Sequence, residues 1–198
     1  MKVNAIAYAA LGTGFTFLLT SAGAAVVFFF KNQIGGNIQK GFLGFAAGVM
    51  VAASVWSLLI PAISEAETMG MIGWVPAALG FAVGGVFLYG LDHLLPHLHL
   101  EEKHPEGLST NWKKTTLLVS AVTLHNIPEG MAVGLAFAMA AQHQDPAMMS
   151  AAMALAIGIG IQNFPEGAAI SLPLRQEGFS RFKAFLCGSL SGIVEPIF

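Results

Sequence analysis

Charged residues and cysteine are both scarce in this chain. Asp, Glu, Lys and Arg make up only 10% of the 198 residues, whereas a soluble domain carries about a quarter. Hydrophobic residues account for 55%, and the mean hydropathy is +0.69. This balance excludes an ordinary soluble domain and predicts a membrane protein. The single cysteine, Cys187, excludes an intrachain disulfide and a metal site built from several thiolates.

Long apolar stretches supply the membrane spans. A helix needs roughly 20 mostly apolar residues to cross a bilayer. The first stretch continues through Phe30, which is too long for the hydrophobic core of a signal peptide, so we expect a retained helix. We predict an all-α polytopic membrane protein in which residues 1–198 form a single transmembrane domain, with the sixth span cut short by the end of the chain. The six spans are expected at about 4–30, 41–63, 71–91, 115–141, 147–173 and 184–198.

The basic residues predict the orientation of these spans. Of the nine Lys and Arg residues, all but Lys2 fall in the loops 31–40, 92–114 and 174–183. The loop around Glu65 and the loop at 142–145 carry none. The positive-inside rule therefore places the N-terminus outside and the three basic loops in the cytoplasm.

Two near-identical hexapeptides lie inside apolar stretches: HNIPEG at 125–130 and QNFPEG at 162–167. A charged side chain in the middle of a membrane helix costs roughly 2.5–3.5 kcal/mol on insertion scales, so it is rare unless it faces a cavity, a partner or an ion path. His125 precedes Glu129 by four positions, so the two project from one helical face as neighbouring ligands. Gln162 and Glu166 repeat this spacing. The repeat predicts a polar site between two helices.

Further oxygens are expected at the same depth. Pro128 and Pro165 lack an N–H, so each frees a carbonyl that is tolerable in lipid only where it meets protein, water or an ion. Helix rise places both hexapeptides near the middle of the bilayer and carries Glu195, in the sixth span, to the same level. Asn126 and Asn163 lie about 100° further round their helices and could serve the same cavity from its side.

The residue types indicate the ion. An imidazole combined with carboxylate and amide oxygens suits Zn²⁺, and Fe²⁺, Mn²⁺, Co²⁺ and Cd²⁺ fit the same ligands. Mg²⁺ or Ca²⁺ would not call for a histidine. A site without thiolates can also release its ion, which transport requires.

These residues resemble the ZIP (Zrt/Irt-like protein) divalent-metal transporters, most of all their GufA-like bacterial branch. The resemblance covers all 198 residues and rests on both Pro-Glu-Gly helices, the small-residue run at 44–50, the histidine-bearing loop after the third span, and SGIVEP at 191–196. It implies an eight-helix fold with spans four and five at its centre, metal import into the cytoplasm, and a bacterial inner membrane. The chain would then lack spans seven and eight. The opposed motif helices also suggest an inverted repeat with the site between its halves.

Carried over residue by residue, the resemblance implies functional positions. Some members hold two metals bridged by shared carboxylates, and Asn163 stands where those members have aspartate, so a second metal site is expected to be weaker or absent. Met50, Ala53 and Ser57 would line the pathway. Asp92, His93, His97 and His99 are candidate exit ligands, with an ordinary solvated linker as the equally weighted alternative. The metal ligands would be His125, Asn126, Glu129, Gln162, Asn163, Glu166 and Glu195.

The expected function is therefore zinc or related metal import by alternating access, without enzymatic activity. An intramembrane metalloenzyme could use the same ligands to activate water, but the sequence has no His-Glu-x-x-His pattern, no nucleophilic serine elbow and no midplane basic cluster. A channel-like facilitator would share the site without the alternating cycle. The expected partners are divalent metal ions and the lipid bilayer, with no nucleic acid. Small-residue faces, including Gly44 and Gly48, are compatible with helix packing or a homodimer.

Overall fold

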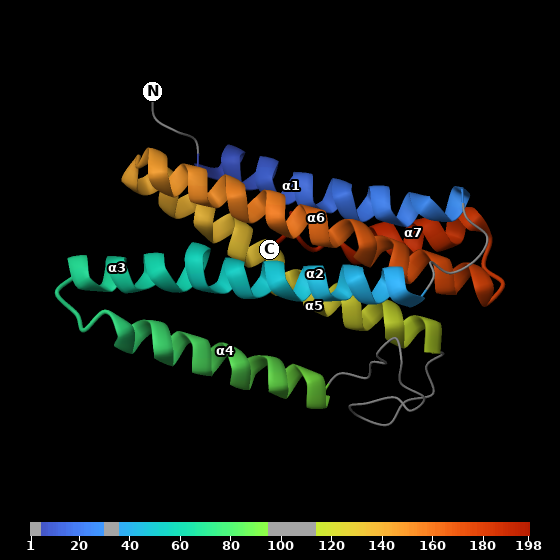
Figure 1. Ribbon diagram of the computed structural model, residues 1–198, viewed down its shortest axis with the longest axis horizontal. Helices are drawn as coiled ribbons and strands as arrows, with labels where there is room; N and C mark the ends of the chain where they lie inside the picture. The colour runs from blue at the N-terminus through green and yellow to red at the C-terminus, as the bar shows by residue number, and fades with distance from the viewer. Residues whose placement is uncertain (1–4, 30–35, 95–113) are drawn as a thin grey trace.

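The computed structural model describes residues 5–29, 36–94 and 114–198. These residues form helices joined by turns and contain no strand, so the all-α prediction is confirmed. A 3₁₀ turn over Ala25–Phe28 extends α1, and a π-helical stretch over Ala53–Leu59 joins α2 and α3 into one continuous rod (Figure 1). The helices are α1 (Ala5–Ala24), α2 (Gly36–Ala52), α3 (Ile60–Thr68), α4 (Trp74–Leu94), α5 (Lys114–His143), α6 (Pro146–Gln176) and α7 (Arg181–Ser191).

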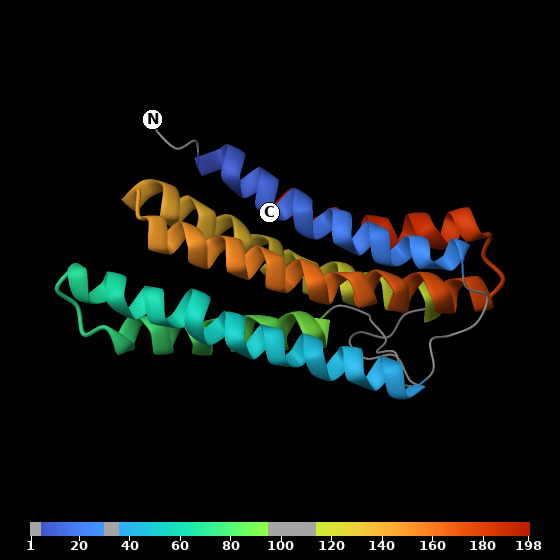
Figure 2. The same cartoon turned by 45° about the horizontal axis from the view of Figure 1, so that its top comes forward.

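The helices run along one long axis and form three groups. Helices α5 and α6, which carry the two hexapeptides, pack together in the middle. Helices α1 and α7 pack against both of them from one side, and the rod of α2 and α3 lies on the opposite side with α4 beside it (Figure 2). The chain ends near the middle of the bundle (Figure 1). The motif helices are therefore covered by protein on two sides.

Two apolar clusters lie at different levels along α5 and α6. One contains Val133 and Phe137 of α5 with Leu155 and Ile159 of α6. The other packs residues 168–174 of α6 against α7 and the end of α1. The hexapeptides occupy the interval between the two clusters, so their polar side chains are enclosed along the bundle axis by apolar packing.

Several helices have the length and composition of membrane spans. Among the described residues, Ala5–Phe28, Ala47–Thr68 and Pro146–Gln176 are long and apolar enough to cross a membrane, and Trp74–Gly90 is a shorter apolar helix. Helix α4 exposes large apolar side chains around most of its surface. Water would disfavour such a surface, whereas the hydrocarbon of a bilayer accommodates it. The first five predicted stretches fall on helical segments and the sixth does so only in its first half, while their limits in the bilayer stay a prediction.

Several helix ends differ from the sequence-based limits. Helix α2 already begins at Gly36, inside the expected loop 31–40, and α6 continues to Gln176, inside the expected loop 174–183. Helix α7 begins at Arg181 because the Ser180 side chain accepts a hydrogen bond from the Lys183 amide at 3.2 Å and caps the helix.

The sixth predicted span is not helical throughout 184–198. Helix α7 ends at Ser191, with Gly192 as its C-cap, and Glu195 lies in the turns that follow. Gly192, a weak helix former, follows the last helical residue, and Pro196 disfavours helical geometry at Glu195, so the helix does not resume there. Glu195 is therefore presented by an irregular segment and not by a helix face.

Candidate metal site

The first hexapeptide presents His125 and Glu129 as adjacent side chains on α5. Their Nε2 and Oε1 atoms are 3.4 Å apart, as the spacing of four residues predicts. The Glu166 carboxylate of α6 joins them, and one ligand atom from each of the three residues lies within 4.8 Å of the others. The His125 side chain is half exposed, whereas that of Glu129 is 8% exposed. The cluster thus has an accessible imidazole and a buried carboxylate.

Gln162 links the two motif helices. Its Nε2 donates a hydrogen bond to Glu129 Oε1 on the neighbouring helix. Gln162 is 2% exposed, so this contact is shielded from water. The amide thereby holds one oxygen of Glu129 in place, and its own Oε1 has no donor.

A second group of polar side chains surrounds Glu195. Its carboxylate Oε1 accepts hydrogen bonds from Asn163 Nδ2 at 3.0 Å and from Thr20 Oγ1 at 3.2 Å. Asn126 Nδ2 donates to the carbonyl oxygen of Ser191 at 3.2 Å. Glu195, Asn126 and Asn163 are fully buried. The asparagines that follow His125 and Gln162 thus connect the motif helices to the segment that carries Glu195.

Oxygen atoms without a donor gather in both groups. A buried acceptor without a partner costs about 1–3 kcal/mol, so several together require an explanation. A divalent cation provides one, because carboxylate and amide oxygens with an imidazole form a suitable ligand set. Within the described part of the chain, the unpaired oxygens in these groups are Asn126 Oδ1, Glu129 Oε2, Gln162 Oε1, Asn163 Oδ1 and Glu195 Oε2.

The glycine of each hexapeptide permits a close backbone approach. A Cβ added to Gly130 would lie 2.5 Å from the carbonyl oxygen of Glu195 and 2.6 Å from its Cα. A Cβ added to Gly167 would clash with the carbonyl oxygen of Thr20 on α1. The repeated glycines therefore let the Glu195 segment and α1 approach the motif helices directly beside Glu129 and Glu166.

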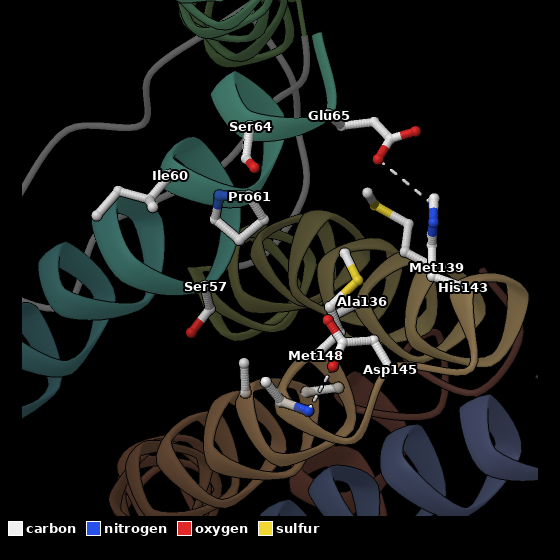
Figure 3. Close-up of a pocket in the computed structure, with 13 residues that line it drawn as sticks. Ser57, Ile60, Pro61, Ser64, Glu65, Ala136, Met139, His143, Asp145 and Met148 are labelled. Carbon is white, nitrogen blue, oxygen red and sulfur yellow. Dashed lines mark hydrogen bonds and ion pairs between the residues drawn. The ribbon is translucent and has the colours of Figure 1, made fainter. Parts of the chain in front are cut away.

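An open cavity lies toward one end of the bundle, between α3, α5 and α6. Its volume is about 560 Å³, and Glu65, His143 and Asp145 stand around it (Figure 3). Glu65 Oε2 lies 3.4 Å from His143 Nε2. The Asp145 side chain accepts a hydrogen bond from the Ala147 amide at 2.8 Å and caps α6. Ala136 is the lining residue of α5 nearest in sequence to Glu129, which is about 10 Å away along the helix.

The three residues expected to line the pathway, Met50, Ala53 and Ser57, do not share one environment. Ser57, on the π-helical stretch, lines this cavity. Ala53 packs against the apolar cluster around Val133, and Met50 is partly buried on α2.

The expected exit residues are only partly described. Asp92 and His93 lie in the last turn of α4, and the exposed His93 ring lies against Tyr89 with ring centroids 4.5 Å apart. His97 and His99 fall outside the described residues. Their role in metal exit stays a prediction.

Sequence reasoning missed Thr20, which bonds to Glu195 across a separation of 175 residues. A weak signal exists, since Thr13, Thr16 and Thr20 recur at helical spacing on the buried face of α1. Such a stripe is equally expected where threonine hydroxyls bond to their own helix, as Thr13 does to the carbonyl of Ala9.

The fold and the cluster define a helical integral membrane protein with a candidate divalent-metal site inside its bundle. Residues 101–197 match the family model described as ZIP Zinc transporter. The human zinc transporter ZIP11 is 37% identical in an alignment 272 positions long, which covers 98% of this chain and 79% of that protein. ZIPB of Bordetella bronchiseptica is 37% identical, with 97% and 60% covered, and GufA of Myxococcus xanthus is 36% identical, with 84% and 64% covered. The chain belongs to the ZIP zinc transporter family.

Proposed function

We propose that this chain carries a divalent transition metal, zinc foremost, through the membrane into the cytoplasm. The observation that carries the proposal is the set of unpaired buried oxygens beside the cluster of His125, Glu129 and Glu166. Relatives named as zinc transporters support zinc as the cargo. Fe²⁺, Mn²⁺, Co²⁺ and Cd²⁺ share the preferred ligands, so selectivity among these ions depends on finer geometry.

The ion would bind in two steps along α5 and α6. The cavity beside Glu65 and His143 provides a hydrated entrance, and Ala136 at its wall lies about two turns from Glu129. At the cluster, waters are exchanged for the imidazole of His125 and the carboxylates of Glu129 and Glu166. The unpaired oxygens of Gln162 and Glu195 extend the ligand set toward α7. Asn126 and Asn163 also offer unpaired amide oxygens, which complete the ligand set.

Release would follow from a rearrangement of the helices that carry ligands. The ligands come from α5, from α6 and from the segment after α7, so relative movement of these elements changes the coordination number. Alternating access through such movement is the common mode of carriers that bind near the middle of the membrane. Metal departure also lets carboxylates take up protons, because binding requires deprotonated ligands.

The orientation of the protein is part of this proposal. The excess of Lys and Arg in the loops 31–40, 92–114 and 174–183 supports a cytoplasmic position for these loops and an outside N-terminus. The cavity beside Glu65 would then open to the outside. A homodimer through small-residue helix faces also stays a proposal.

Zinc flux into proteoliposomes tests the function. We would compare the native protein with Glu166→Ala and with the control Glu177→Ala, which removes an exposed carboxylate just beyond the end of the same helix. Saturable uptake that is lost only in Glu166→Ala supports the proposal. Metal binding without flux in the native protein contradicts it and favours a metalloenzyme or a structural metal site. Flux that rises linearly with zinc concentration and depends weakly on temperature contradicts a carrier and favours a channel-like facilitator.

A further inference from the structure

The hydroxyl of Thr20 lies where two acceptors compete for its single proton. Oγ1 is 3.2 Å from the carbonyl oxygen of Thr16, one turn earlier in α1, and 3.2 Å from Glu195 Oε1. Hydrogen bonds to a charged acceptor are roughly twice as strong as those between neutral groups. The proton is therefore directed to the carboxylate when Glu195 is ionised.

Glu195 depends on its neighbours for orientation. It lies beyond the end of α7, in turns where its amide bonds to the carbonyl of Gly192 at 3.1 Å. Two donors, Asn163 Nδ2 and Thr20 Oγ1, converge on its Oε1. Its Oε2 is buried without a partner. The carboxylate is thus held by one oxygen and presents the other.

The backbone around Thr20 is tightly packed against the site. A Cβ on Gly167, the residue after Glu166, would clash with the Thr20 carbonyl oxygen. A Cβ on Gly192 would lie 3.0 Å from both the Thr20 Cβ and the Glu195 Oε1. The hydroxyl therefore has a defined position relative to Glu166 and Glu195. Helix α1 contributes to the geometry of the site although none of its residues is among the expected ligands.

We propose that Thr20 is a positioning residue, whose hydroxyl holds Glu195 so that its free oxygen is presented to the transported divalent cation. This inference rests on the proposed function. Without the Thr20 hydroxyl the carboxylate would lose one of its donors. It would keep Asn163 Nδ2 and the nearby Thr16 hydroxyl, and would have to be ordered more fully when the ion binds. Ordering one flexible side chain costs about 0.5–1.5 kcal/mol, which corresponds to an affinity weaker by about two- to tenfold.

The test compares Thr20→Val, which replaces the hydroxyl by a methyl group of similar size, with Thr20→Ser, which keeps the hydroxyl. The control is Thr13→Val, the same change at a buried threonine of α1 whose hydroxyl bonds to the carbonyl of Ala9. The KM for Zn²⁺ uptake into proteoliposomes is expected to rise by about two- to tenfold in Thr20→Val, with the maximal rate retained. Thr20→Ser and Thr13→Val are expected to keep the native KM.

A role in packing alone would lower the maximal rate and would not be rescued by serine. An unchanged KM in Thr20→Val, or an equal effect in Thr13→Val, overturns the inference. If Thr20→Val folds poorly, the inference is tested instead with three other variants: Thr20→Ser, Thr20→Ala and Glu195→Gln. Thr20→Ala must then raise the KM when it is made alone. The double variant Thr20→Ala with Glu195→Gln must have the same KM as Glu195→Gln, because the effects of two contacting residues are not additive. The proposed function fails separately, if native protein shows no saturable flux or Glu166→Ala retains it.

Discussion

Gly130→Ala should displace Glu195 and weaken metal binding, although it adds a single methyl group. The new Cβ would lie 2.5 Å from the carbonyl oxygen of Glu195, 2.6 Å from its Cα and 2.9 Å from its carbonyl carbon. Carbon contacts normally lie at about 3.5–4.0 Å, so the segment has to move by about 1 Å. All three atoms are backbone atoms, which no side-chain rotation can remove. Overpacking of this kind costs about 1–3 kcal/mol.

Gly134→Ala is the matched control, one helical turn further along α5. A Cβ at Gly134 would meet no atom within 4 Å. The same substitution there should be neutral, or stabilise the helix by up to about 1 kcal/mol, because alanine has the higher helix propensity. The two variants therefore separate the close contact at Gly130 from the general effect of alanine in α5.

The assay is thermal unfolding of the purified protein in detergent, with and without Zn²⁺. Gly130→Ala should unfold at a lower temperature than native protein and gain less from Zn²⁺, since the displaced segment carries a ligand. Gly134→Ala should retain the native response to Zn²⁺. Equal stability and an equal zinc response in the two variants would refute the close packing of Gly130 against Glu195.

Other substitutions test the remaining contacts. Asn163→Asp removes the donor to Glu195 and places two carboxylates together, so the metal-free protein should lose about 1–3 kcal/mol of stability. Zn²⁺ should raise the unfolding temperature of this variant more than that of native protein. A variant that is more stable than native protein without metal would contradict this. Glu65→Gln should change stability by less than about 1 kcal/mol, because its contact with His143 is partly exposed, and should raise the KM for zinc modestly at low ionic strength. High salt should abolish that difference in flux measurements, and an effect that persists would argue for direct coordination.

Much of the candidate site could be predicted from local spacing. Four residues separate His125 from Glu129, and helix geometry alone brings their side chains together, as the distance of 3.4 Å between them confirms. The repeated hexapeptide also indicated that Glu166 would face the same region, and its carboxylate does join this cluster. Such predictions succeed because they depend only on the rise and periodicity of one continuous helix.

Other features had no sufficient local signal. Gln162 bonds to Glu129 on the adjacent helix, a contact that depends on how α5 and α6 are rotated against each other. The π-helical stretch that carries Ser57 arises within an apolar run whose composition also suits an ordinary α-helix. The end of α7 at Ser191 could not be predicted from hydrophobicity, because apolar residues continue to residue 198 although the helix does not.

The sequence by itself determined that this is a helical membrane protein, which residues share a helix face, and which side chains have metal-ligating chemistry. These properties follow from composition and from the regular geometry of single helices. Only the tertiary structure decided that Thr20 bonds to Glu195 and that Gly130 lies against the Glu195 backbone. Contacts between remote segments depend on how whole helices pack, and no periodicity within one helix specifies its partner.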